Sequence, residues 1–252
     1  MQSYKCLPII LLISTLILAP SADGHIEGLL FQEHPPKTTA GILLQSGRYQ
    51  INNNNVALSI NSFAEYALSS NLSVGVGLPL GQYQDQFQLS DAVVAVKSAL
   101  PLQTFTAVPM ILFEVPTGME PMTSGHTEIV PALFLEKKIP DIHLYGSIKG
   151  RAEVGESDDE HGHLNVLAPH ATDELAGDAG ISYWVADHIG LDARINGYYE
   201  DFESFHPGVE VGVVYQNTTR QGTTVKASLG YYTISSGVRE GSGLGFSFYI
   251  AP

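Results

Sequence analysis

The sequence predicts an all-β fold, a single antiparallel transmembrane β-barrel of about 12 strands that follows a cleaved signal peptide. Three observations lead to this prediction. The N-terminus has the composition of a secretory signal, several of twelve strand-length segments alternate between apolar and polar side chains, and the connections between the segments alternate between short and long.

Residues 1–24 resemble a signal peptide. A short n-region containing Lys5 precedes an apolar run over residues 7–18, and residues 19–24 offer small side chains for cleavage. The apolar run is shorter than the roughly 18–20 residues of a membrane-spanning helix, although a retained N-terminal anchor is the alternative. Cys6 is the only cysteine. The mature chain should therefore have no disulfide and no thiol nucleophile.

Residues 25–38 have no sustained period, and Pro35 and Pro36 stop any strand because proline cannot donate to a ladder. We expect a periplasmic tail, or a short insertion that plugs the barrel mouth. The barrel itself is expected over residues 39–252 as a single domain.

Residues 141–154 give the clearest transmembrane strand. Every second residue is apolar or small, as in Ile142, Leu144 and Ile148, whereas the residues between them are polar and carry both signs of charge. We call these two alternating sets the apolar and the polar parity of a strand. The segment exceeds the roughly 9–11 residues that a tilted strand needs to cross a bilayer. This pattern is typical of a barrel strand with an apolar face toward lipid and a polar face toward the lumen.

The remaining chain divides into similar segments. The twelve predicted strands are residues 40–49, 56–66, 72–80, 91–100, 105–115, 127–137, 141–154, 175–186, 189–199, 208–216, 224–233 and 243–250. Pro79, Pro109 and Pro131 lie inside them, so either the prolines mark bulges or the strand limits are wrong there.

The connections indicate the compartment. With these strands, every longer loop falls on one side of the barrel and every shorter turn on the other, as in outer-membrane proteins whose short turns face the periplasm. We therefore expect a Gram-negative outer membrane, with its lipid as a partner. A secreted β-sandwich is the alternative. The net charge of −14 argues against nucleic acid as a partner.

The polar parities of the strands supply candidate lumenal residues. These are His143, Lys149, Arg151, Glu153, Asp192, Arg194, Glu128 and Glu136, together with Glu210 and Lys226. Opposite charges on neighbouring strands can pair and fill a narrow interior. They can equally form a constriction that selects solutes by charge, with Lys149, Arg151 and Arg194 facing Glu128, Glu136 and Asp192. Both interpretations stay open.

Residues 105–115 are apolar on both parities. We expect Val108, Met110 and Leu112 to form an apolar patch that faces the lumen and suits an apolar solute. Packing against the tail explains the same residues equally well. Four tyrosines lie near strand ends among the apolar residues of the alternating pattern, as in the aromatic girdles of membrane barrels. They are Tyr183, Tyr199, Tyr215 and Tyr231.

The loop at residues 155–174 is rich in histidine and acidic side chains. Its candidate metal ligands are His161, His163, His170 and Asp159. Two imidazoles at i and i+2 beside carboxylates can bind Zn²⁺, Cu²⁺ or Ni²⁺, but a loop without a thiol predicts only weak divalent binding. A hydrated surface loop is the simpler interpretation.

The middle of the chain resembles a known family. Residues 113–118 (FEVPTG) end a strand in a Pro-Thr-Gly turn, a loop with Gly125 follows, and two strands come after it. With residues 77–81 (GLPLG), this pattern over residues 56–155 resembles the outer-membrane family named for the meta-pathway of phenol degradation. The resemblance implies a signal peptide, a barrel, passage of small, often hydrophobic or aromatic molecules across the outer membrane, and no catalytic motif.

The sequence therefore predicts an outer-membrane channel or transporter for small molecules, including hydrophobic or aromatic ones. The alternatives are a metal-associated outer-membrane protein that uses residues 155–174, or a structural barrel with a filled lumen. We do not expect an enzyme, because the chain has no Gly-x-Ser-x-Gly elbow and its spacing indicates no Ser/His pair. The solute and the oligomeric state are not determined by the sequence.

Overall fold

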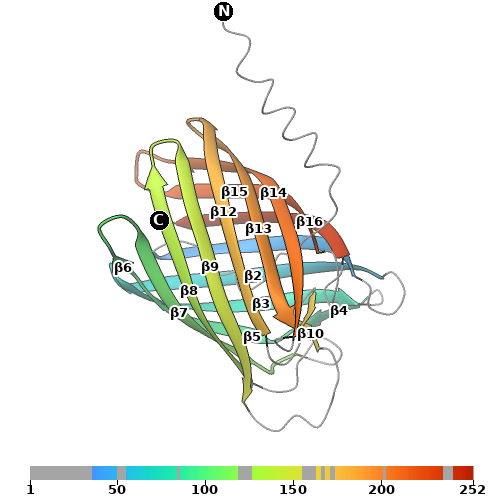
Figure 1. Ribbon diagram of the computed structural model, residues 1–252. Helices are drawn as coiled ribbons and strands as arrows, with labels where there is room; N and C mark the ends of the chain where they lie inside the picture. Colours follow the sequence, from blue (N-terminus) through green and yellow to red (C-terminus); the bar gives the residue numbers. More distant parts are fainter. Residues whose placement is uncertain are drawn as a thin grey trace, which may run out of the picture.

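The structure is a computed structural model that describes residues 36–49, 55–83, 86–118, 127–154, 163–165, 168–170, 174–200, 203–234 and 241–251 (Figure 1). The expected signal peptide and most of the expected tail lie outside these residues. No helix within the described ranges is long and apolar enough to span a membrane.

Twelve long strands form one closed barrel. They are β1 (Thr39–Tyr49), β2 (Asn55–Ser69), β3 (Leu72–Tyr83), β5 (Ala92–Ser98), β7 (Thr106–Val115), β8 (Thr127–Ile139), β9 (Ile142–Val154), β12 (Glu174–Ala186), β13 (Ile189–Glu200), β14 (Ser204–Thr218), β15 (Thr224–Ile234) and β16 (Gly241–Ala251). Neighbours pair antiparallel around the ring, which closes because β1 pairs with both β2 and β16. Closure satisfies the backbone of every strand without an open edge, as a bilayer requires. The predicted twelve-stranded antiparallel barrel is confirmed.

Four short strands were not predicted. β4 (Gln86–Leu89) pairs with β3, β6 (Leu100–Pro101) pairs with β7, and β10 (His163–Asn165) forms a separate hairpin with β11 (Ala168–His170). β14 also begins at Ser204, four residues before the expected start, and its Pro207 pairs in register with Gly197. Strands of two to four residues are too short to show a period of two.

The prolines inside strands mark neither bulges nor wrong limits, which corrects both expectations. Pro109 and Pro131 pair in an unbroken register between β7 and β8, and Pro79 does so between β2 and β3. Each proline instead lies where pairing to the other neighbour stops. The β5 partners end at Met110 of β7 and at Gly77 of β3, and the β8–β9 ladder is interrupted between Ile129 and Ala132. A missing N–H costs little at such positions.

The outer surface of the barrel is apolar. Along β3, Leu72, Val74, Val76, Leu78 and Leu80 are all exposed, whereas Ser73 between them is fully buried on the inner face. Tyr183 and Tyr215 lie outside near the short turns, and Tyr199 and Tyr231 lie outside near the long loops (all four are exposed). Such an apolar band between aromatic girdles fits a lipid bilayer rather than water.

The inner face holds two different regions. On the β2–β9 side, apolar side chains fill the lumen in two clusters. The first contains Val93, Ala95, Leu112 and Val130 with Phe63, Met110 and Ala132 packed against it, and the second contains Val108, Phe134 and Tyr145. The structure thus places Val108 and Leu112 inside the lumen, each 1% exposed, with Met110 packed against both clusters. The other side of the barrel contains an open cavity.

Candidate functional site

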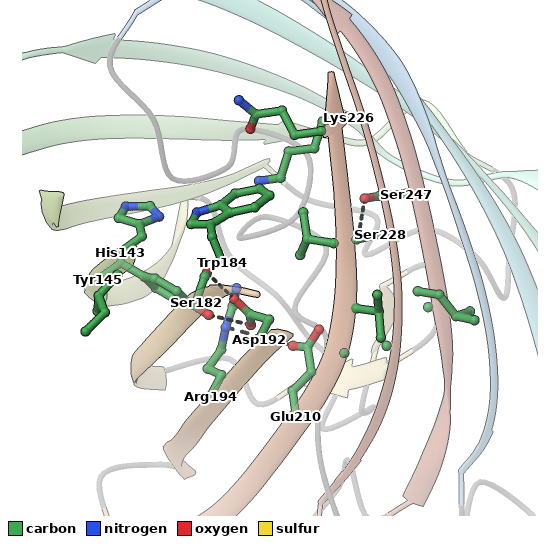
Figure 2. Close-up of a pocket in the computed structure, with 18 of the residues that line it drawn as sticks. His143, Tyr145, Ser182, Trp184, Asp192, Arg194, Glu210, Lys226, Ser228 and Ser247 are labelled. Atoms are coloured by element: carbon green, nitrogen blue, oxygen red, sulfur yellow. Dashed lines mark hydrogen bonds and ion pairs between the residues drawn. The ribbon is translucent and has the colours of Figure 1, made fainter. Parts of the chain in front are cut away.

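A cavity of about 440 Å³ lies inside the barrel at the end that carries the short turns (Figure 2). Its lining includes Lys138 and Pro140 from the β8–β9 turn region, and Thr224 and Lys226 from the start of β15. Most of the remaining wall comes from β9 and β12–β16, with Leu43 from β1 and Lys37 from the segment before it. We call this space the mouth cavity.

Asp192 of β13 is held at the centre of one wall by two hydroxyl groups. Tyr145 Oη donates to its Oδ2 over 2.6 Å, and Ser182 Oγ donates to its Oδ1 over 2.5 Å. The Tyr145 ring reaches β13 by lying across Gly180 of β12, where an added Cβ would be 2.3 Å from the ring. Glycine at position 180 is therefore required for this contact.

Arg194 lies beside this group. Its guanidinium carbon is 5.1 Å from the centroid of the Tyr145 ring, and its Nε is 3.9 Å from Glu210 Oε2 on the next strand. The register pairs Arg194 directly with Glu210. Stacking on an aromatic face and a nearby carboxylate both favour the charged guanidinium.

Glu136 joins Lys138 and His143, two basic side chains that line the cavity. Its Oε2 lies 3.0 Å from His143 Nε2 and 2.9 Å from Lys138 Nζ. The three residues come from the facing ends of β8 and β9. This group fixes the His143 ring, which Figure 2 shows on the same side of the cavity as Tyr145.

Trp184 supplies the largest aromatic surface of the mouth cavity. It is the only tryptophan of the chain. Its ring lies against Gly190, where an added Cβ would be 3.2 Å from Cε3. Figure 2 shows the indole among the side chains that line the cavity, which also include His143 and Lys226.

Lys37 extends the charged lining from outside the spanning strands. Its backbone N–H donates to Glu65 Oε1 over 3.2 Å, which holds the segment at the mouth. The pKa of the Lys37 amine is lowered to about 8, mainly by burial and also by the charge of Lys226, against the opposing charge of Glu65. Lys138 and Glu136 also act on this pKa. Lys37 and Lys226 both line the mouth cavity, so the segment before β1 and the start of β15 each contribute a basic side chain to it.

A second charged group lies inside the lumen near the long loops. Arg151 Nη1 lies 3.0 Å from Glu114 Oε2, and the same nitrogen contacts Glu128 Oε2. The three side chains, from β7, β8 and β9, are at most 5% exposed. An ionic group this buried requires its opposite charge, because an unpaired charge there would be costly.

The structure brings together some of the predicted lumenal residues. Arg151 meets Glu128, and Glu114 joins them although the sequence analysis did not single it out. Lys149 is buried on the inner face of β9. The backbone of Glu153 pairs with that of Glu128, but the Glu153 side chain lies outside the described part of the structure.

One interpretation of the sequence placed the lumenal charges in a single constriction. In the structure these charged side chains instead form two groups at opposite ends of the lumen. Arg151 and Glu128 lie near the long loops, whereas Glu136, Asp192 and Arg194 lie in or beside the mouth cavity. Sequence analysis missed Trp184, although it shares a parity with Ser182 on a predicted strand. It also missed Lys37, for which no sequence signal exists because its position depends on how the tail meets the barrel.

The predicted metal ligands are only partly described. Asp159 and His161 lie outside the described residues, and His163 pairs with His170 across the β10–β11 hairpin. No group of three or more His, Cys, Asp or Glu is placed to hold a metal ion within the described ranges. Metal binding by residues 155–174 stays a prediction.

The Pro-Thr-Gly turn has a structural role at the long-loop rim. Asp91 Oδ1 accepts hydrogen bonds from the backbone N–H groups of Thr117 and Gly118, both over 3.1 Å. In return, Thr117 Oγ1 accepts the N–H of Ala92 over 2.9 Å. An added Cβ on Gly118 would be 2.7 Å from Leu89 O, so the approach needs glycine. We call these contacts the rim latch.

Comparison with known proteins supports the fold. The KdgM porin has a TM-score of 0.55 and 8% identity, and the match covers 83% of this chain and 97% of that one. The NanC porin has a TM-score of 0.52 and 12% identity, with 83% and 98% covered. The translocator domain of the autotransporter NalP from Neisseria meningitidis has a TM-score of 0.51 and 12% identity, with 90% and 91% covered.

At these identities the likeness shows the fold alone. The closed barrel, its apolar outer band and these outer-membrane relatives in fold locate the chain in a bacterial outer membrane. No protein-family model and no curated protein matches the chain. The resemblance to the phenol meta-pathway family therefore stays a prediction.

Proposed function

We propose that this protein is an outer-membrane channel for small molecules. The observation that carries the proposal is the mouth cavity, a polar, charged space of about 440 Å³ inside a barrel whose outer face is apolar. A space lined by Asp192, Arg194 and Lys226 holds water and polar solutes. The same arrangement of an apolar exterior and a polar interior is typical of porin-like barrels.

The proposed route runs along the β12–β16 wall. The inner face there carries small residues such as Gly212, Gly230 and Gly245, all of which line the mouth cavity. The β5–β8 wall is filled by apolar side chains instead. Near the long loops the route passes the level of the Arg151 group, which lies on the β7–β9 side of the lumen. Hydrophobic or aromatic solutes, as the family resemblance implies, would pass the apolar side chains of the lumen.

A structural barrel with a filled lumen is the second candidate, and one observation favours it. Arg151, Glu114 and Glu128 are almost fully buried, so the lumen is narrow at their level. We do not propose an enzyme. The hydrogen bond of His143 goes to Glu136 and that of His188 to a backbone carbonyl, rather than to a serine hydroxyl.

Single-channel recording separates the two candidates. The full mature chain is refolded and inserted in a planar bilayer, and the wild type is compared with Arg151→Gly, which removes the long side chain from the narrow level. A channel gives discrete conductance steps that grow in Arg151→Gly. Silence in both proteins, when both are folded by their heat-modifiable mobility on gels, supports the filled barrel and contradicts the channel.

A further inference from the structure

We propose that a groove in the outer wall of the barrel binds one acyl chain of a membrane lipid. The groove has a volume of about 640 Å³ and lies on β9, β12, β13 and β14, which are neighbours in the barrel (Figure 1). We call it the outer groove. It shares no lining residue with the mouth cavity, so the inference goes beyond the proposed channel function and does not depend on it.

The floor of the outer groove is a row in which two large side chains are missing. The register pairs Gly177 of β12 with Gly197 of β13. The same row ends in Ile148 of β9 on one side and in Pro207 of β14 on the other. Because side chains on one face of a strand stand two residues apart, about 7 Å, two adjacent glycines leave a gap of about that width.

Large apolar side chains stand on both sides of this row. The neighbouring row toward the long loops carries Leu175, Tyr199 and Phe205, and the row toward the short turns carries Ile195 and Val209. Ile195 is 65% exposed, so it projects from the wall. The glycine row is therefore a depression between two ridges rather than part of a flat surface.

Aromatic packing fixes one end of the outer groove. The Phe205 ring lies over Gly197, where an added Cβ would be 2.5 Å from Cζ, and its centroid is 5.1 Å from that of Tyr199. Over Gly177 the space is open. Among the described residues, an added Cβ there would have only the carbonyl oxygen of Ser147 within 4 Å, at 3.1 Å. The open part of the floor thus lies between Ile148 and the Phe205 ring.

The chemistry of the outer groove indicates its occupant. Its exposed surface is almost wholly apolar, and none of the side chains of its floor and ridges carries a charge. It is continuous with the apolar band that faces the bilayer, so it opens into hydrocarbon rather than water. An unfilled groove loses the dispersion contacts of its lining atoms, and a single polymethylene chain restores them.

A second copy of the barrel fits the outer groove less well than a lipid chain. Ile148 and Ile195 are 52% and 65% exposed and project on two sides of the open floor. They hold the wall of another barrel away from the floor, whereas one acyl chain is narrow enough to lie between them.

Counting bound lipids tests the inference. The full mature chain is refolded in detergent micelles, titrated with dipalmitoylphosphatidylethanolamine and observed by native mass spectrometry. We expect one lipid to bind saturably, with an apparent Kd at least about fivefold lower than that of any further lipid, because only the groove surrounds a chain on several sides. The dihexanoyl lipid with the same headgroup should lack this tight step, since its chains are too short to fill the groove.

A matched pair of variants assigns the tight step to the outer groove. Ala179→Leu adds a large side chain at an exposed position of the lining and should remove the step. Ala193→Leu makes the same change on the lipid-facing side of β13, where Ala193 pairs with the exposed Ile181 but does not line the groove. This control should keep the tight step. Heat-modifiable mobility on gels verifies that both variants are folded.

Photolabelling of the wild type locates the lipid without any variant. In lipid vesicles, a phospholipid with a diazirine in the middle of one acyl chain should label Ile148, Leu175 and Ile195 more densely than Val74 and Val76. The latter two are exposed on the lipid-facing side of β3, outside the groove. Labelling of β3 as dense as that of the groove would contradict the proposal.

The titration can also overturn it. A first lipid that binds no more tightly than later ones, or the same tight step in Ala179→Leu and Ala193→Leu, would exclude a specific site in the outer groove. A protein dimer that Ala179→Leu dissociates and Ala193→Leu preserves would show that a second copy of the chain, not a lipid, occupies the groove.

Discussion

Lys97 Nζ lies 2.8 Å from Glu65 Oε2, and both side chains are 2% exposed. The two residues come from β5 and β2, which are separated in the barrel by β3. The other oxygen of Glu65 accepts the backbone N–H of Lys37. The Glu65 carboxylate thus contacts both β5 and the segment before β1, and it holds them at the same end of the lumen.

This buried ion pair predicts a large loss of stability when one partner is removed. In Lys97→Met the Glu65 carboxylate stays buried without its closest cation, and the free energy of unfolding should fall by roughly 3–5 kcal/mol. Denaturant unfolding of the refolded barrel in lipid vesicles measures it. The double variant Glu65→Leu/Lys97→Met, which leaves no unpaired charge, should regain most of the loss. A single variant as stable as the wild type would show that water reaches the pair.

Arg151 should control the ionic selectivity of the narrow level. Arg151→Gln leaves Glu114 and Glu128 without their guanidinium partner, so the negative charge of the lumen there increases. We expect the permeability ratio of potassium over chloride to rise several-fold, measured as a shift of the reversal potential across a salt gradient. Adding Glu114→Gln and Glu128→Gln should reverse the shift. An unchanged reversal potential would mean that ions do not pass this group.

The rim latch should contribute measurably to stability. Asp91→Ala removes the charged acceptor of two partly buried hydrogen bonds from backbone amides, at a cost of about 1–3 kcal/mol in the free energy of unfolding. Asp91→Asn keeps an oxygen acceptor and should lose less. Gly118→Ala should also destabilise, because its Cβ would collide with the Leu89 carbonyl. If the alanine and asparagine variants of Asp91 unfold at the same denaturant concentration as the wild type, the latch has no energetic role.

The lowered pKa of Lys37 predicts a specific pH dependence. Its pKa is about 8 in the folded barrel and takes the ordinary lysine value of about 10.5 in the unfolded chain. Between these two values the unfolded chain binds more protons, so deprotonation favours the folded state and stability should increase as pH rises through this window. Lys226 and Lys138 oppose the charged amine, whereas Glu65 and Glu136 support it.

Comparison with Lys37→Met isolates this effect from other titrating groups. The difference in unfolding free energy between wild type and variant should change in favour of the wild type from about pH 8 to about pH 10.5. Lys137→Met, at an exposed position on the same rim, is the control and should follow the wild type. A constant difference between wild type and Lys37→Met across the window would contradict burial of the amine at the mouth.

The barrel could be predicted from the sequence because a strand in a membrane barrel separates two environments. The period of two in segments such as β3 and β9 records which side chains meet lipid and which meet the lumen, and this determined the strand number and the location in the outer membrane. The alternation of loop lengths added the direction of each strand. β4, β6 and the β10–β11 hairpin escaped detection because they are too short to show a period.

Only the tertiary structure decided which lumenal charges meet. The polar parity predicted that Arg151, Asp192 and Arg194 face inward, but not that Arg151 selects Glu114 and Glu128 or that Asp192 is held by Tyr145 and Ser182. Partners inside a barrel depend on the register of several strands and on distances across the lumen, as between Glu65 and Lys97. The sequence by itself therefore determined an outer-membrane barrel with a polar interior, and strand register and closure decided that this interior contains a filled wall, a buried ionic group and a mouth lined by charges of both signs.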